Sequence, residues 1–102
     1  MNEVKVGTVT GTGAAINVSL GFVPDYVKVV NVTDRDQIDE WFKGMPADTS
    51  VQTNTAVATR DTNGISEYAG TSTSPPGFTI GSGISEADKV LRYVAIRNSA
   101  GA

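Results

Sequence analysis

β-Branched side chains dominate this chain. Val, Ile and Thr together supply 31 of the 102 residues, whereas Leu occurs only twice. A branched β carbon restricts χ1 in a helix but suits the pleated surface of a sheet. No long stretch of the sequence repeats apolar residues with the period of a helix. The composition therefore predicts an all-β protein.

The pattern within short segments predicts about eight strands separated by turns rich in Gly, Pro and Asn. Apolar and polar side chains alternate in Ile16-Asn17-Val18, as they do in a half-buried strand. An Asn63-Gly64 pair predicts a tight hairpin turn between two of the strands. The predicted strands are residues 3–10, 14–20, 25–32, 38–43, 51–60, 65–68, 78–80 and 89–97.

Strands of this number and length predict a two-sheet antiparallel sandwich, with a jelly roll as one form of it. The length suits a single domain over residues 1–102. We expect residues 1–9 to form a contact arm or an edge strand, and residues 98–102 to be a frayed tail. The order of the strands does not follow from the pattern.

The residue types present exclude several classes of function. The chain has no Cys and no His, which excludes disulfides, the usual zinc sites and nucleophiles that depend on Cys or His. We therefore expect no enzymatic activity and no cofactor. Eight basic residues against eleven acidic ones, spread along the chain, argue against a nucleic-acid partner. We find no membrane-helix pattern and no signal peptide, so we expect synthesis in the cytoplasm and no membrane partner.

A cluster of acidic residues follows the third predicted strand. It consists of Asp34, Asp36, Asp39 and Glu40. Carboxylate oxygens are ligands that Ca²⁺ prefers, but the cluster lacks the spacing and the glycine of an EF-hand loop. We therefore expect a solvated turn and no metal ion.

The pair Trp41-Phe42 presents one aromatic ring to each side of a strand, because successive strand residues alternate. We expect Phe42 to lie in the core. Trp41 lies between charged residues, and we expect it to face a partner as an interface anchor. The alternative is that Trp41 packs inside its own subunit, as large aromatic residues commonly do.

Two strands, 26–32 and 90–96, carry apolar residues on both sides. We place Val94 of the second strand in the core. Because a sandwich buries one face of each strand, the other face predicts self-association. With the first segment and the Pro-containing loop 70–77, these features give the candidate partner-binding residues Trp41, Tyr26, Tyr93, Pro75, Pro76, Val4 and Val6.

Four segments of the chain resemble small structural proteins from the virions of tailed bacteriophages. They are GFVPDYVKVVNVT (21–33), EWFKGM (40–45), GFTIG (77–81) and KVLRYVAIR (89–97). The matching residues are packing and turn residues, and the resemblance transfers no active-site residue. It implies a β-rich decoration, cement or fibre-base protein that is commonly oligomeric.

The resemblance implies a capsid decoration protein as the first expectation. Such a protein binds the outer surface of the phage head as an oligomer, expected to be a trimer, and bridges major capsid subunits. It is made in the bacterial cytoplasm and located in the virion. The alternative is a tail, baseplate or head-fibre module that binds another virion protein or a host glycan, with Trp41, Tyr68 or Tyr93 stacking on a sugar ring.

Overall fold

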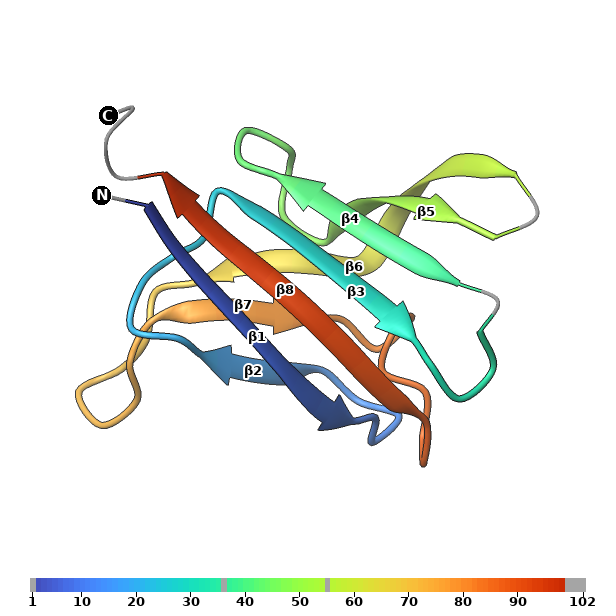
Figure 1. Ribbon diagram of the computed structural model, residues 1–102, viewed down its shortest axis with the longest axis horizontal. Helices are drawn as coiled ribbons and strands as arrows, with labels where there is room; N and C mark the ends of the chain where they lie inside the picture. The colour runs from blue at the N-terminus through green and yellow to red at the C-terminus, as the bar shows by residue number, and fades with distance from the viewer. Residues whose placement is uncertain (1, 36, 55, 99–102) are drawn as a thin grey trace.

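The computed structural model describes residues 2–35, 37–54 and 56–98, and these residues form eight antiparallel strands (Figure 1). The strands are β1 (Asn2–Thr10), β2 (Ile16–Ser19), β3 (Tyr26–Asn31), β4 (Ile38–Phe42), β5 (Thr49–Thr53), β6 (Val57–Tyr68), β7 (Gly77–Ile80) and β8 (Val90–Asn98). Within these three ranges no helix is long and apolar enough to cross a membrane. The prediction of an all-β protein with about eight strands is confirmed.

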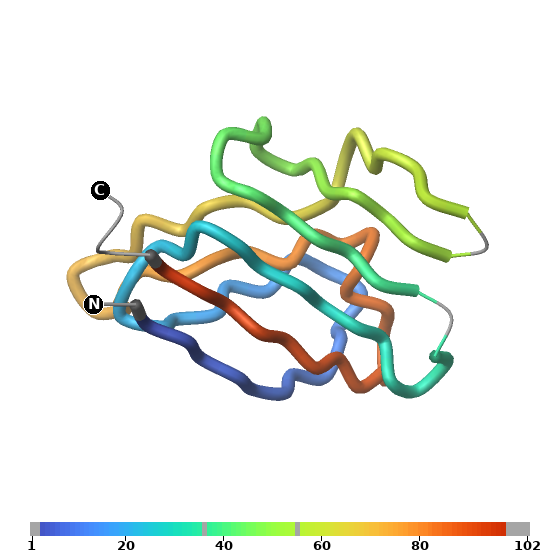
Figure 2. Tube along the Cα trace, turned by 45° about the horizontal axis from the view of Figure 1, so that its top comes forward, coloured from blue at the N-terminus to red at the C-terminus, as the bar shows by residue number. Residues whose placement is uncertain are grey.

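Hydrogen bonds join all eight strands into one sheet, in the order β1-β8-β3-β4-β5-β6-β7-β2. The sheet curls like a half-barrel, so that β1, β8 and β3 lie in front of β2, β7 and β6 (Figures 1 and 2). A sandwich or jelly roll of two separate sheets is therefore not what we find. The reason is that β3 pairs with β4, β4 with β5 and β5 with β6, which carries the pairing from one layer to the other.

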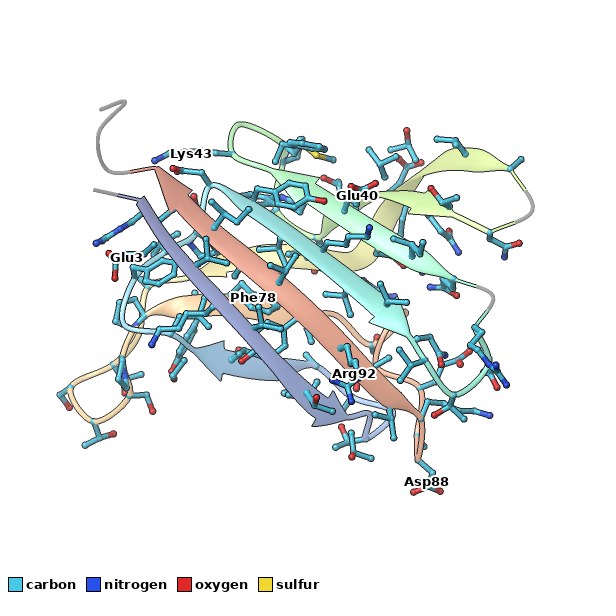
Figure 3. The ribbon with its side chains drawn as sticks, in the orientation of Figure 1. Glu3, Glu40, Lys43, Phe78, Asp88 and Arg92 are labelled. Atoms are coloured by element: carbon cyan, nitrogen blue, oxygen red, sulfur yellow. The ribbon has the colours of Figure 1, made fainter. Side chains whose placement is uncertain are left out.

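The hydrophobic core fills the space between the two layers. Phe78 of β7 is fully buried and lies behind β8 in Figure 3. Its ring packs edge-on against Tyr93, with 5.3 Å between the ring centroids. The buried core residues are Val18, Val27, Val29, Trp41, Ile65, Phe78, Ile80, Ile84, Leu91 and Ala95.

The last strand, β8, has two apolar sides, and the burial of its residues identifies the one that faces the core. Leu91 and Ala95 are fully buried, whereas Val94 is only half-buried and lies on the other side with exposed Arg92. The placement of Val94 in the core was therefore wrong. Both sides of the strand are apolar, so hydrophobicity alone did not distinguish them, although the charge of Arg92 marks the outer side.

The predicted hairpin at Asn63-Gly64 is also wrong, because β6 continues through this pair without reversing. Ser50 of β5 pairs with Arg60, but the preceding Thr49 pairs with Ile65. Residues 61–64 therefore bulge out of the ladder, with Asn63 at a φ of 57°. Asn-Gly supplies the left-handed backbone that a tight turn needs, and the same property serves a bulge within a strand. The chain reverses instead between β5 and β6.

The two ends of the chain were expected to be an arm or edge strand and a frayed tail. Residues 2–10 form β1, which is the first strand in the order of the sheet and so an edge strand. Residue 1 and residues 99–102 lie outside the described residues. Residue 98 is the last residue of β8.

Candidate interaction surface

Strands β1, β8, β3 and β4 place one set of side chains on the side of the sheet that faces away from the core. Successive residues of a strand point to opposite sides, so the neighbours of buried Val27, Val29 and Leu91 point outward. We call this surface the outer face. It consists of Val4, Val6, Thr8, Arg92, Val94, Ile96, Tyr26, Lys28, Val30, Ile38, Glu40 and Phe42.

Most of the outer face is apolar. Val6 is 72% exposed, Val4 57% and Phe42 48%, which are large fractions for apolar side chains. The strand register places Val4, Ile96, Tyr26 and Phe42 side by side in one row across four strands. The rings of Tyr26 and Phe42 lie 5.0 Å apart between centroids. Contiguous exposed apolar residues of this kind mark an interaction site.

Charged groups lie in the middle of the outer face. The Tyr26 hydroxyl donates a hydrogen bond of 2.6 Å to Glu40 Oε2. Lys28 is the direct cross-strand neighbour of Glu40, and Arg92 follows along the same face. Within the described part of the chain, the structure gives neither Lys28 nor Arg92 an ion pair. The outer face is therefore apolar around a few central charged residues, and Lys28 and Arg92 can still form ion pairs with another molecule.

The phenol of Tyr26 is held in its protonated form. Burial, together with the hydrogen bond to Glu40 and the charge of that carboxylate, raises the pKa of Tyr26 from 10.0 to about 12. The folded protein then binds this proton more tightly than the unfolded chain does. The stabilisation by Tyr26 is complete below pH 10 and is lost as the pH rises toward about 12.

We expect Tyr26→Phe to remove one group from the alkaline titration of the folded protein. Ultraviolet absorbance of tyrosinate, followed during a pH titration, should lose the component that titrates near pH 12. The variant should also lose the fall in thermal stability that this group contributes between about pH 10 and about pH 12. A Tyr26→Phe protein with the same late component in its titration curve would contradict the assignment.

The outer face brings together three of the predicted partner-binding residues. Val4 and Val6 project from β1, and Tyr26 projects from β3 into the same surface. Pro75 and Pro76 are elsewhere, in the loop that joins β6 to β7 in the back layer (Figure 1). Pro75 is exposed and Pro76 is half-buried. The predicted residues therefore mark two separate surfaces.

Trp41 and Phe42 have the opposite placement from the one predicted. Trp41 is only 2% exposed and belongs to the core, whereas Phe42 lies on the outer face. The alternation along β4 was correct, but the charge of Asp39 on the side of Trp41 misled the assignment of the faces. Asp39 is itself fully buried. The alternative that Trp41 packs inside its own subunit is the one that the structure shows.

Tyr93 is not available as a contact residue on the outer face, because its side chain points to the inner side of β8. Its ring packs against Phe78, and its hydroxyl lies over Gly7 of the neighbouring strand. A β carbon built on Gly7 would lie only 2.4 Å from the Tyr93 hydroxyl oxygen. A glycine at this position therefore makes room for the ring.

A buried polar cluster surrounds Asp39, and no motif in the sequence indicated it. The Asp39 carboxylate pairs with Arg60 Nε at 2.9 Å and accepts hydrogen bonds from Ser50 Oγ at 2.7 Å and from Gln37 Nε2 at 2.9 Å. These donors come from β5, from β6 and from the segment just before β4. Such a cluster links the three strands, and its donors compensate for the burial of the charge.

The acidic residues 34–40 do not form a common site. Asp39 points inward to Arg60, whereas Glu40, the next residue in the strand, points outward to Tyr26. Asp34 lies in the turn beyond β3, where a hydrogen bond from Lys89 holds its pKa below the usual value. Asp36 lies outside the described residues. Among the residues that the structure describes, no group of acidic side chains is arranged to hold a metal ion.

Known proteins offer no guide to the role of these surfaces. Comparisons with protein-family models, curated proteins and solved structures find no match. The resemblance to phage virion proteins therefore stays a prediction from the four sequence segments. The assignment of a function therefore depends on two surfaces, the outer face and the loop that joins β6 to β7.

Sequence reasoning missed the larger part of the outer face. Phe42 and Val94 were placed in the core, and Val30 and Ile38 were not among the candidate partner-binding residues. In β3 and β8 a signal was nevertheless present, because Lys28 shares a strand side with Val30 and Arg92 shares one with Val94. In these two strands the charged residue indicates the side that meets water or a partner, whereas β4 carries Asp39 on one side and Glu40 on the other and gives no such indication.

Proposed function

We propose that this protein is a non-catalytic decoration protein of a bacteriophage head. In this proposal several copies associate, attach to the outer surface of the head and bridge neighbouring major capsid subunits. The resemblance of four segments to virion proteins supports a place in the bacteriophage particle. The observation that supports a binding role is the apolar outer face across β1, β8, β3 and β4, with Val6 72% exposed and Val4 57% exposed.

Two distinct surfaces suit a protein that must contact both its own copies and a capsid. The outer face is broad and apolar, as an interface between copies of one chain commonly is. The loop between β6 and β7 is polar and compact. Thr71 Oγ1 accepts hydrogen bonds from the amides of Thr73 and Ser74, and the Thr71 amide donates to Ser74 O. Pro75 and Pro76 then restrict the backbone, which lowers the entropy lost when such a loop binds.

The edge strand β1 is a second candidate for contact with the capsid. It has one neighbour, β8, in the order of the sheet. An edge strand presents backbone groups that can pair with an extended segment of another protein. Several copies joined together would engage several capsid sites at once, and the effective concentration at the later contacts would strengthen modest individual interfaces.

The number of copies per virion tests this proposal. Purified virions of the source phage should be digested and the chain quantified by mass spectrometry against the major capsid protein. We expect a ratio near one or a simple fraction of it, since decoration requires capsid-scale copy number. A small number per particle would instead assign the protein to the tail, the baseplate or a fibre. Absence from the virion would overturn the proposal.

A further inference from the structure

We infer that the part of the outer face formed by β8, β3 and β4, extended by β5, is covered by a second copy of the same chain, stacked face to face about a two-fold axis. The axis lies in the interface and runs along the strands, between β3 and β4. This inference specifies the self-association within the proposed function. It concerns the purified protein alone, so it can be tested without a virion.

The strand register makes the outer face complementary to itself. On either side of the axis, Tyr26 is opposite Phe42 and Lys28 is opposite Glu40 in directly paired positions of β3 and β4. A rotation of 180° about an axis parallel to the strands keeps the position along each strand and exchanges the two sides. Each β3 then lies over the partner's β4. Lys28 consequently faces the partner's Glu40, and Tyr26 faces the partner's Phe42.

The charges in the centre of the face favour this arrangement. Lys28 has no ion pair within the described residues. The Glu40 carboxylate accepts the hydrogen bond from Tyr26 and has further lone pairs for another donor. In the dimer each Lys28 meets the partner's Glu40, and symmetry produces this contact twice. An apolar partner would instead bury Lys28 without an ion pair and leave Glu40 with the Tyr26 hydroxyl as its donor, which is costly.

Apolar residues extend the contact on both sides of the charged pair. Val30 and Ile38 are cross-strand neighbours one step along the face, and they exchange positions in the same way. Further from the axis, Val94 is paired beside Lys28 and Val51 is paired beside Glu40. The rotation therefore places Val94 over the partner's Val51. Two sheets stacked in this way pack about 10 Å apart and within about 30° of parallel.

The size of the stacked region suits a weak dimer. The four strands β8, β3, β4 and β5, about 4.8 Å apart, with three rows of outward side chains, cover roughly 400 Å² in projection. Two copies then bury on the order of 800 Å² together, which is in the range of weak, transient interfaces. The face also includes a shallow hollow of about 240 Å³ bordered by Lys28, Val30, Arg92, Tyr93 and Val94. Side chains from the partner's β4 and β5 lie over this hollow in the two-fold arrangement.

The two-fold symmetry differs from the trimer expected from the resemblance. A three-fold axis brings two different patches of the chain together, whereas a patch complementary to itself closes as a dimer. Exchange of Lys28 and Glu40 requires the two-fold axis. Association of such dimers through the loop or the edge strand remains compatible with attachment to a capsid.

Charge reversal at the two central positions tests the inference. Sedimentation equilibrium should show a monomer–dimer equilibrium for the unaltered protein, with dimer present at about 100 µM. Lys28→Glu sets a new carboxylate against the partner's Glu40, and Glu40→Lys sets a new ammonium group against the partner's Lys28. We expect each variant alone to dimerise at least about 10-fold more weakly, because like charges then face each other. An equimolar mixture should form a heterodimer with an affinity within about threefold of the original.

The mixture separates contacts between copies from contacts within one chain. Each variant also places like charges side by side in its own sheet, and mixing cannot relieve that repulsion. Restored association can therefore come only from charges that meet across the interface. Thermal unfolding checks that both variants are folded. Lys5→Glu, an exposed change of the same size on the other side of β1, should leave dimerisation unchanged.

Three results would overturn the inference. The unaltered protein could be monomeric throughout the concentration range, it could form trimers that charge reversal does not affect, or the mixture could associate no better than its components. None of these results would change the expected copy number in the virion. Conversely, absence of the chain from virions would leave the dimer standing as a property of the purified protein.

Discussion

Leu91→Asp is expected to abolish cooperative folding, whereas Val94→Asp, three residues along the same strand, should leave a folded protein. Leu91 is fully buried between the two layers of the curled sheet. A carboxylate there loses its hydration without gaining a partner, and the apolar contacts of Leu91 are lost as well. The combined cost is of the order of the whole stability of a small domain, about 5 kcal/mol or more.

Val94 occupies the other side of β8, on the outer face, where it is only half-buried. A carboxylate at this position can reach water and lies next to Lys28 in the register of β3 and β8. We expect a loss of stability of about 1 kcal/mol. Dimerisation should weaken much more, because the new charge sits in the face that the second copy covers.

Far-ultraviolet circular dichroism during urea denaturation measures both variants. The Leu91→Asp protein should show no cooperative transition, and the Val94→Asp protein should show one with an unchanged slope. Ala95→Asp provides a second test of the buried side, since Ala95 is also fully buried. The reverse result, with Val94→Asp unfolded and Leu91→Asp folded, would show that the two sides of β8 are assigned the wrong way round.

The sequence was sufficient to predict strands but not to decide which side of a two-faced strand is buried. In β2 the polar residues Asn17 and Ser19 are exposed, and the alternation with Val18 predicted the buried side correctly. In β4 and β8 both sides carry apolar residues, so the hydrophobic pattern has no preferred direction. The contacts that determine which side is buried involve residues distant in sequence. Asp39 is buried because Arg60 reaches it from β6.

Local turn signals were reliable only where no distant strand competed with them. Asn63 has the left-handed backbone that a hairpin turn requires, with a φ of 57°. The chain nevertheless continues, because Ile65 finds a partner in Thr49 of the same neighbouring strand. Beyond the bulge the Asp48 amide donates a hydrogen bond to Ile65 O, and the Gly64 amide donates one to Asp48 O. The strand order depends on such choices and could not be predicted from spacing.

Only part of the outer face followed from the sequence. Val4 and Val6 alternate with charged residues in the first segment, and this pattern predicts a strand whose apolar side is covered by other apolar groups, whereas both valines are exposed in the structure. The rest of the surface depends on β3, β4 and β8 being neighbours, which the sequence does not reveal. Tyr26 and Phe42, sixteen residues apart in the numbering, become adjacent only through pairing of β3 with β4.

Arg60→Met is the second change with a large expected effect, and it acts through Asp39. The Asp39 side chain is 1% exposed and that of Arg60 is 16% exposed, so the ion pair between them is largely shielded from water. Methionine fills much of the same volume but leaves the carboxylate without its compensating charge. Removal of one member of a buried pair costs about 3 to 5 kcal/mol. Hydrogen bonds from Ser50 and Gln37 remain, which places our expectation near the lower value.

A double-mutant cycle distinguishes loss of charge compensation from loss of packing. Asp39→Asn removes the negative charge and keeps a side-chain oxygen that can accept the hydrogen bond from Ser50 Oγ. If the uncompensated charge is the cause, Arg60→Met should cost about 2 kcal/mol less in the Asp39→Asn background than in the original protein. Arg92→Met is the control, because Arg92 is exposed and has no ion pair within the described residues, and it should cost less than about 0.5 kcal/mol. Equal costs of Arg60→Met in both backgrounds would show that the guanidinium contributes packing alone, and that the carboxylate of Asp39 is adequately compensated by its two neutral donors.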